Sequence, residues 1–370
     1  MFYKSGTMAL AAALQVARER RAVADPQAII PAYGCPDLVS AAEYAGIRPV
    51  MVDLAEQRPW LDLAQVERQI NDRTVALVGV HLFGIPERGA QLRRLAEAGD
   101  LLYIEDAAQS YPYARQQRDW AGHFTVLSFG RGKPVTILGG GAVLSEDAEL
   151  FARLPIPDGY PLVEAWSRPL KWRSYNFLRA PARYRWLRAM PFLRLGETHY
   201  RPLRGDWSGI SPDARAVLAG NLANYQNASL QRQQWLAEMA AQFQSRGVLD
   251  VAAACGIMGA ALGALSRYPL LLPSPQVRDA LLARINETCG GGSPMYPAPL
   301  PEILPPMVGG TTEAGFPHAT DWSRRLVTLP LHDGVTLDIV QHIGRLLAMV
   351  LDSDNSCIDD EYDGVRGRHG

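Results

Sequence analysis

The chain has 370 residues, of which 48% are hydrophobic and 20% charged, the ordinary proportions of a soluble globular protein. Its 37 Lys and Arg nearly balance its 38 Asp and Glu, and the net charge of -1 argues against a general nucleic-acid binder. No apolar run approaches the roughly 20 residues that span a bilayer, and the start turns charged too early for a signal peptide. A chain of this length is too long for one simple core, so we expect two domains or one large domain with an appendage.

The four cysteines, Cys35, Cys255, Cys289 and Cys357, are scattered along the chain. They form no CxxC pair and show no metal-ligand spacing. This pattern predicts reduced thiols, a cytoplasmic protein and no cysteine-bound metal.

The first 150 residues alternate between two periodicities. Helical spacing of apolar residues predicts helices over 8–21, 61–70 and 86–100. Short apolar runs predict strands at 28–33, 49–54, 74–83, 101–110, 125–129 and 139–145. Such alternation predicts an α/β fold, with a mainly parallel central sheet flanked by helices. Ligands of these sheets bind at the carboxyl ends of the strands, which places near one crevice Glu105, Asp106, Gln109 and Ser128.

The later chain is less regular. One long helix is expected over 214–247, and a final helix over 339–351. We therefore expect a large domain over 1–234, a smaller α+β C-terminal domain over 235–352, and a disordered polar tail over 353–370.

A segment rich in Arg, Trp and Pro and poor in acids interrupts the large domain at about 153–205. Three interpretations are open. The segment is a solvated crossover packed on the domain, or its arginines bind the diphosphate of a nucleotide-sugar. Alternatively, residues 165–195 contact an anionic membrane surface as an interfacial helix, although Pro181 and Pro191 limit the length of such a helix.

Lysine occurs only at Lys4, Lys133 and Lys171, because the chain uses arginine for almost every other positive charge. Lys133 lies between glycine-rich turns in SFGRGKPVTILGGGAVL, residues 128–144. An amine can lose its proton and become a nucleophile, which a guanidinium cannot do. Lys133 is therefore a candidate for covalent chemistry.

Asp106 ends a predicted buried strand, where a carboxylate needs a cation. The simple interpretation is a structural ion pair with Lys133. The functional one is that Lys133 forms a Schiff base with pyridoxal phosphate, while Asp106 keeps the pyridine nitrogen protonated. The residues alone leave both interpretations open.

Other candidates lie nearby in the predicted fold. The turn SGT at 5–7 opens a helix, so it is either a phosphate site or a plain cap with Ser5 or Thr7 as N-cap. The Ser128 hydroxyl could reach the same phosphate. The glycines at 139–141 are a flexible turn or allow a close backbone approach.

Five segments of the sequence together match the pattern of a known family. They are SGTMAL, IIPAYGCPDLVSAAEYAGIRPVMVDL, VHLFGIP, IEDAAQS, and SFGRGK followed by GGGAVL. In this order and spacing they resemble the DegT/DnrJ/EryC1/StrS family, and VTLPLHDGVT is similar to its late segment. These are fold-type-I aminotransferases that depend on pyridoxal phosphate and usually act on nucleotide-linked keto-sugars. The resemblance implies that fold, that cofactor, a homodimer and a role in polysaccharide or glycoconjugate biosynthesis, with glutamate as the typical amino donor.

The resemblance also implies residue roles. Lys133 corresponds to the Schiff-base lysine, Asp106 to the partner of the pyridine nitrogen, and Gln109 to the contact on the ring-hydroxyl side. The phosphate-binding groups correspond to Gly6, Thr7, the backbone of Met8, and Ser128. His81 is expected to be structural or to support residues near the cofactor, and His332 to stabilise a turn or a dimer edge.

The sequence departs from the family pattern in three ways. Cys35 stands where relatives stack an aromatic residue on the pyridine ring, with Tyr33 two residues away as a substitute. The region GDWSGIS lacks the asparagine and arginine of the family's GYN-x-R stretch. Relatives also carry some tens of residues before the SGT turn. A degenerate family member acting as a binding or scaffold subunit is therefore an alternative, as is a sugar dehydratase, although dehydratases typically replace the lysine with histidine.

Overall fold

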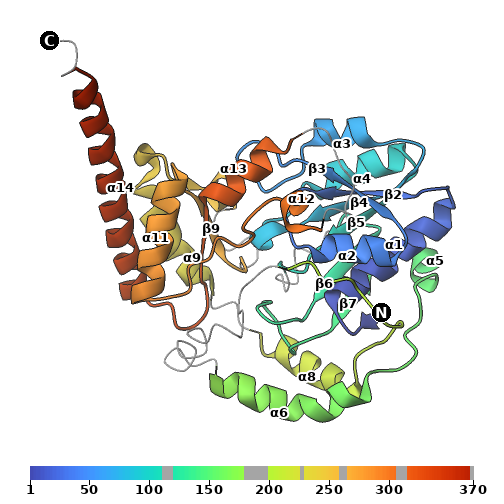
Figure 1. The fold of residues 1–370 in the computed structure, drawn as a ribbon. Helices are drawn as coiled ribbons and strands as arrows, with labels where there is room; N and C mark the ends of the chain where they lie inside the picture. Colours follow the sequence, from blue (N-terminus) through green and yellow to red (C-terminus); the bar gives the residue numbers. More distant parts are fainter. Residues whose placement is uncertain (111–119, 179–198, 226–228, 258–264, 306–314, 367–370) are drawn as a thin grey trace.

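The computed structural model describes residues 1–110, 120–178, 199–225, 229–257, 265–305 and 315–366. Figure 1 shows two sheets, each covered by helices, with the final helix at one edge of the molecule. None of the described helices combines the length and the apolar character that crossing a bilayer requires.

The large sheet has seven strands in the order β1-β7-β6-β5-β4-β2-β3. Pairing is parallel from β3 through β6, and antiparallel where β7 joins β6 and β1 joins β7. The mainly parallel sheet predicted from the sequence is confirmed. The strands are β1 (Phe2–Tyr3), β2 (Gln27–Pro31), β3 (Arg48–Val52), β4 (Thr74–Val80), β5 (Leu102–Asp106), β6 (Phe124–Ser128) and β7 (Gly141–Leu144).

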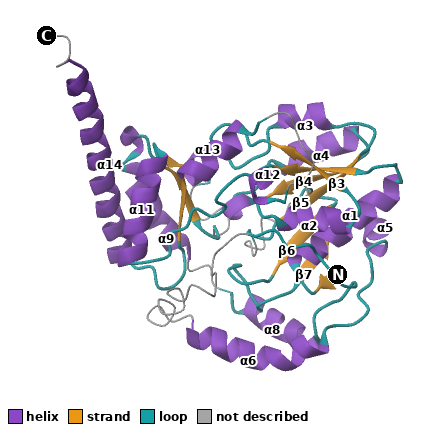
Figure 2. Cartoon of the chain, in the orientation of Figure 1, coloured by secondary structure: helices purple, strands orange, loops and turns teal. Residues whose placement is uncertain are grey.

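Helices cover both faces of this sheet, because side chains along each strand alternate in direction. Ala76 and Val78 of β4 pack in the core that α1 (Gly6–Arg21) and α2 (Asp37–Tyr44) contribute to. Leu77, between them, packs on the other face with Leu92 of α4 (Gly89–Ala98) and with α3 (Leu63–Gln69). The result is the three-layer α/β arrangement that the alternating periodicities predicted (Figure 2).

The second sheet has three antiparallel strands in the order β10-β9-β8, namely β8 (Leu249–Asp250), β9 (Tyr268–Leu271) and β10 (Leu326–Leu329). Three helices pack together beside it: α9 (Ser229–Ala241), α11 (Pro275–Thr288) and α14 (Leu337–Arg366). This α+β part matches the expected smaller unit, while its boundary at 234–235 stays a prediction. Shorter helices are α5 (Ala148–Ala152), α10 (Val251–Ala254), α12 (Leu300–Ile303), α13 (Pro317–Arg325), and the 3-10 turns η1 (Leu82–Gly84) and η3 (Gln244–Arg246).

The second unit contacts the carboxyl edge of the large sheet. Asp53, directly after β3, is fully buried and accepts hydrogen bonds from the backbone of His318 and Ala319, at 2.9 and 2.8 Å, at the start of α13. Backbone bonds also join Ser266 to Phe83 at 2.8 Å and Leu300 to Ala32 at 2.7 Å. The second unit thus encloses one side of the region where ligands of parallel sheets bind.

Two predictions about helices need correction. The long helix expected over 214–247 is two helices, α8 (Pro212–Ala223) and α9. Asn224 ends α8, since both its backbone N–H and its side chain donate to the Gly220 carbonyl, at 3.0 and 2.9 Å. Asparagine favours such ends because its side chain competes for backbone groups.

The final helix also differs from its prediction. It extends to Arg366 rather than ending at residue 351, while the disorder expected over 353–370 stays a prediction. Once a helix has started, each further residue adds one hydrogen bond, and this favours continuation over a polar stretch.

A short approach between backbones fixes the start of α1 against β7. A Cβ on Gly141 would lie 2.5 Å from the Ser5 carbonyl oxygen and 2.7 Å from the Gly6 Cα. The GGG run therefore permits a close approach, as expected. At Gly141 the approaching group is the backbone of Ser5 and Gly6.

We predict that Gly141→Ala lowers the free energy of unfolding by about 1–3 kcal/mol, because the added methyl group must displace backbone. Chemical denaturation measures the change. Gly139→Ala is the matched control, since its Cβ would lie 3.8 Å from the nearest atom, the Lys4 carbonyl oxygen. An equal loss in both variants would contradict this packing argument.

Candidate active site

The candidate site lies where β5, β6 and α1 meet. Asp106 is the last residue of β5 and Ser128 the last residue of β6, the neighbouring parallel strand. Both are partly exposed at the carboxyl edge, as the sequence predicted. Asp106 and Ser128 therefore face the edge at which α1 begins.

The start of α1 packs directly on Ser128. A Cβ on Gly6 would lie 2.7 Å from the Ser128 Cβ and 2.8 Å from its Oγ, so only glycine fits there. Ser5 is the N-cap, because its side chain accepts from the Met8 N–H at 3.1 Å. The structure thus brings together the SGT turn and Ser128, while the Met8 N–H, expected to bind phosphate, has a partner within the turn.

A carboxylate that the sequence analysis did not single out lies beside this turn. The Thr7 hydroxyl donates to Asp37 Oδ2 at 2.9 Å, and Asp37 is an exposed residue in the first turn of α2. A negative charge there opposes a phosphate dianion. The only sequence signal was an aspartate directly after the Cys-Pro pair at 35–36.

Asp106 is held at its end of the strand by its neighbours. Its Oδ1 accepts from the Ala108 N–H at 2.9 Å, and its carbonyl accepts from the His81 N–H at 3.0 Å. Burial raises the pKa of the Asp106 carboxyl, and the Ala108 N–H and the positive charge of Lys133 oppose that rise. A cation placed next to Asp106 would therefore favour the ionised form of this carboxyl.

Lys133 lies half-buried on the loop after β6. Its amine forms no ion pair with Asp106 within 4.0 Å, and neither group is paired with the other among the described residues. A plain Asp106–Lys133 ion pair is therefore not what the structure holds. An acid and an amine that act on opposite ends of one ring do not touch each other, so the separation agrees with the functional interpretation.

Gln109 and Tyr33 lie in the contact between the two units. Gln109 is buried, its Oε1 accepts from the Phe83 N–H at 3.0 Å, and its Nε2 donates to the Tyr296 hydroxyl at 3.2 Å. The Tyr33 ring is fully buried and meets Tyr296 edge to face at 5.4 Å. Its enclosure does not favour Tyr33 as the ring-stacking substitute, and the cofactor contact of Gln109 stays a prediction.

Cys35 lies closer to the charged groups of the site. Burial raises the pKa of its thiol to about 12, the Asp37 carboxylate adds to the rise, and Lys133 opposes it. The thiol is therefore neutral at physiological pH and not a nucleophile. Its place opposite a cofactor ring stays a prediction.

The two histidines have the structural roles that were expected. The buried His81 ring lies 3.0 Å from Ser110 Oγ through Nδ1 and 3.0 Å from Glu105 Oε1 through Nε2. Glu105 also accepts from the Gly122 N–H at 3.2 Å. His332 accepts from the Gly334 N–H at 3.1 Å within a turn. His81 thus fixes the end of β5 and positions Asp106.

A family model for the DegT/DnrJ/EryC1/StrS aminotransferases matches residues 2–156 and 212–348. This is more than half of the chain, so the chain belongs to the DegT/DnrJ/EryC1/StrS aminotransferase family. The family is one of aminotransferases that depend on pyridoxal phosphate, which confirms the expected family and cofactor class.

Two curated relatives show what the chain is similar to. It is 36% identical over 183 residues to a dTDP-3-amino-3,4,6-trideoxy-alpha-D-glucose transaminase of Streptomyces venezuelae, covering 49% of this chain and 46% of that protein. It is 31% identical over 117 residues to a GDP-perosamine synthase of Escherichia coli O157:H7, covering 31% of this chain and 32% of that protein. The matched segments thus span less than half of the length of these relatives.

Solved structures show the same fold. DesV of S. venezuelae has a TM-score of 0.68 at 23% identity, covering 95% of this chain and 84% of that one. The PMP-form of the putative sugar aminotransferase Spr1654 from Streptococcus pneumoniae has a TM-score of 0.70 at 18% identity, covering 97% and 87%. At this identity the likeness confirms the fold class predicted from the sequence.

We predict that Asp37→Asn tightens the binding of pyridoxal phosphate about fivefold, because it removes a negative charge beside the Thr7 hydroxyl. The gain should shrink at high salt, since exposed charges are screened. Absorbance titration at two salt concentrations measures both effects. Asp25→Asn, an exposed aspartate before β2 at the opposite edge of the sheet, should bind as the wild type does. Weaker binding by Asp37→Asn would show that this carboxylate supports the turn instead.

Proposed function

We propose that this protein is an aminotransferase that uses pyridoxal phosphate to move an amino group from an amino acid to a keto-sugar. The observation that carries the proposal is the pair Lys133 and Asp106, an amine and a partly buried acid that do not pair with each other, at the edge where the SGT turn meets Ser128. Family membership supports it, since both residues lie within the matched segment 2–156.

The residues present fit this cofactor. Gly6 lets the start of α1 pack directly on Ser128, and this contact brings the SGT turn next to the Ser128 hydroxyl. Lys133 would hold the aldehyde end, and Asp106 the ring nitrogen. When bound, the ring withdraws electrons from the donor's α-carbon.

Lys133 then serves as the base. A lysine amine next to the donor's Cα can accept its proton and deliver it elsewhere, which is general acid–base catalysis. An amine locked in an ion pair would be protonated and unable to accept a proton. The missing Asp106–Lys133 pair is therefore a condition for this role.

Asp106 serves as the charge that keeps the ring nitrogen protonated. Burial makes its ionised form costly, as the raised pKa shows. Asp106 would regain its ionised form beside a cationic ring nitrogen and would in turn stabilise that positive charge.

The finer parts of the proposal concern substrates and assembly. A nucleotide-linked acceptor is supported by the names of the relatives, a dTDP-sugar transaminase and a GDP-perosamine synthase. Arginines of the segment 153–205 are candidates for its diphosphate. We further propose that glutamate is the donor, that the protein is a homodimer, and that it acts in glycoconjugate synthesis. A cytoplasmic location is also proposed, and the free thiols of the described cysteines agree with it.

A second candidate is a binding or scaffold subunit without turnover. Three observations favour it: the Asp37 carboxylate lies beside Thr7, the Tyr33 ring is enclosed, and the region 205–211 packs on its own subunit. There, Trp207 packs edge to face on Tyr44 at 5.1 Å, and the Lys4 N–H donates to the Ser208 carbonyl at 2.7 Å. Lys133 remains an argument against a dehydratase.

Lys133→Arg tests the proposal directly. The variant keeps the charge but cannot bond the aldehyde, so turnover and the visible band at about 400–430 nm should both disappear. Borohydride reduction of the loaded wild type should fix the cofactor on the peptide that holds Lys133, and the chain has only two other lysines. Lys171→Arg, an exposed position, is the control and should retain both properties. Cofactor fixed on Lys4 or Lys171, or turnover by Lys133→Arg, would refute the assignment.

Asp106→Asn should retain bound cofactor but slow the donor half-reaction at least about 100-fold, because the amide cannot hold a charged ring nitrogen. Single-turnover absorbance measurements with glutamate separate this rate from product release. A rate within a few-fold of the wild type would remove Asp106 from the mechanism. A colourless wild-type protein that takes up no cofactor would instead favour the scaffold subunit.

A further inference from the structure

The helix α6 (Leu162–Leu178) lies at an edge of the molecule beside α8 (Figure 1). It falls in the stretch 157–211, which the family model leaves unmatched. Its residues therefore do not belong to the shared catalytic scaffold, and the proposed function does not account for its exposed apolar side chains.

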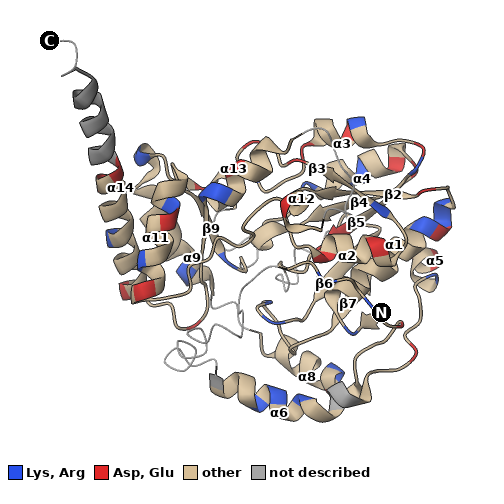
Figure 3. Ribbon diagram, viewed as in Figure 1, with Lys and Arg blue, Asp and Glu red and all other residues tan. Residues whose placement is uncertain are grey.

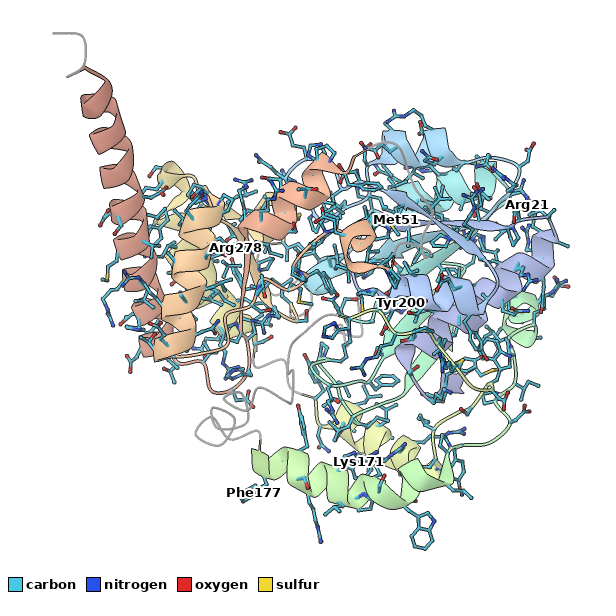
Figure 4. All side chains as sticks on the ribbon, viewed as in Figure 1. Arg21, Met51, Lys171, Phe177, Tyr200 and Arg278 are labelled. Atoms are coloured by element: carbon cyan, nitrogen blue, oxygen red, sulfur yellow. The ribbon has the colours of Figure 1, made fainter. Side chains whose placement is uncertain are left out.

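Large apolar side chains on α6 are exposed to solvent. Leu162 is 65%, Trp166 85% and Leu170 70% exposed, and Phe177, at the far end of the helix in Figure 4, is 59% exposed. With 3.6 residues per turn, positions 162, 166, 170 and 177 lie within one face. Leu162, Trp166 and Leu170 form an apolar stripe on successive turns, and Arg173 separates them from Phe177 on the same face. Exposed apolar side chains gathered on one face mark a site of interaction.

The opposite face of α6 is bonded to the body of the protein. The Trp172 indole donates to the Ile137 carbonyl at 3.1 Å, and Arg168 donates to Ser211 Oγ at 3.3 Å. Ser211 is the N-cap of α8, and Ile137 lies on the same loop as Lys133. These bonds orient the apolar stripe outward.

The charge around the stripe is positive. Lys171 and Arg173 are exposed on α6, and Figure 3 shows Lys and Arg along this helix. Within α6 the sequence has three basic residues, Arg168, Lys171 and Arg173, and one acidic residue, Glu164.

We propose that α6 binds the surface of a membrane that contains anionic phospholipids. The helix lies in the plane of the interface, with Leu162, Trp166 and Leu170 among the acyl chains. The flexible side chains of Lys171 and Arg173 reach the lipid phosphates. An exposed apolar face with basic residues beside it is the pattern of interfacial helices.

A second copy of the chain fits this surface less well. A two-fold contact through α6 would bring the basic residues of both copies into one interface, and like charges repel. A few side chains on one helix also supply less than the about 800 Å² per partner that stable interfaces bury. An anionic lipid surface satisfies both the apolar and the basic residues.

Vesicle flotation of the full, cofactor-loaded protein tests the proposal. The protein should float with vesicles of phosphatidylcholine and phosphatidylglycerol, much less with phosphatidylcholine alone, and less as salt increases. The double variants Trp166→Ser with Leu170→Ser and Lys171→Glu with Arg173→Glu should each lose binding at least about tenfold. Leu337→Ser with Met349→Ser, which changes two exposed apolar residues of α14, is the matched control and should float as the wild type does.

The loaded variants should keep the wild-type thermal transition, which separates lost binding from misfolding. Absence of flotation by the wild type, or unchanged flotation of either α6 double variant, would overturn the proposal. So would sedimentation velocity that shows self-association lost in Trp166→Ser with Leu170→Ser without any lipid binding, because α6 would then be a contact between copies. The outcome is independent of turnover, so failure of this proposal leaves the proposed function intact.

Discussion

The carboxylate of Asp106 sets the requirements for the rest of the candidate site. Asp106 ends a strand in largely apolar surroundings, where its ionised carboxylate is poorly solvated. This burial raises the pKa of the Asp106 carboxyl. Lys133 acts on this acid through its charge without forming an ion pair with it. The proposed function gives both groups a partner, since a cationic ring would bind the amine at one end and the acid at the other. A structural ion pair between Asp106 and Lys133 would not explain their separation.

The second constraint is steric. Gly6 and Gly141 let the start of α1 approach the ends of β6 and β7 at distances that a methyl group would prevent. This approach joins the helix start, with its partial positive charge, to the Ser128 hydroxyl in one small region. Asp37 works against the same region, since it supplies a competing negative charge to Thr7. The affinity of the turn for a phosphate thus depends on two opposing effects. The start of α1 attracts the phosphate, and the Asp37 carboxylate repels it.

The sequence predicted what depends on local pattern. Parallel strands end at one edge, so Asp106 and Ser128 could be placed together from periodicity and order alone. It did not predict contacts between distant segments: Gln109 and Tyr33 bond to Tyr296, nearly two hundred residues or more later in the chain. It missed α2 because eight residues carry too little periodicity, and it joined α8 to α9 because Asn224 does not interrupt the apolar pattern. Each of these outcomes depends on tertiary contacts that a residue pattern does not record.

The two proposed activities use different parts of the chain. The acid, the amine and the SGT turn lie on the scaffold that the family shares, whereas α6 lies in a stretch outside it. The two parts are nevertheless linked, since Trp172 of α6 bonds to Ile137, four residues after Lys133. A surface that attaches to lipid would therefore hold the lysine loop at a fixed distance from the membrane. Trp172, and not Trp166, makes that link. Substitutions in the apolar stripe therefore need not disturb the loop that carries Lys133. A binding surface on α6 can in this way coexist with the proposed catalytic site.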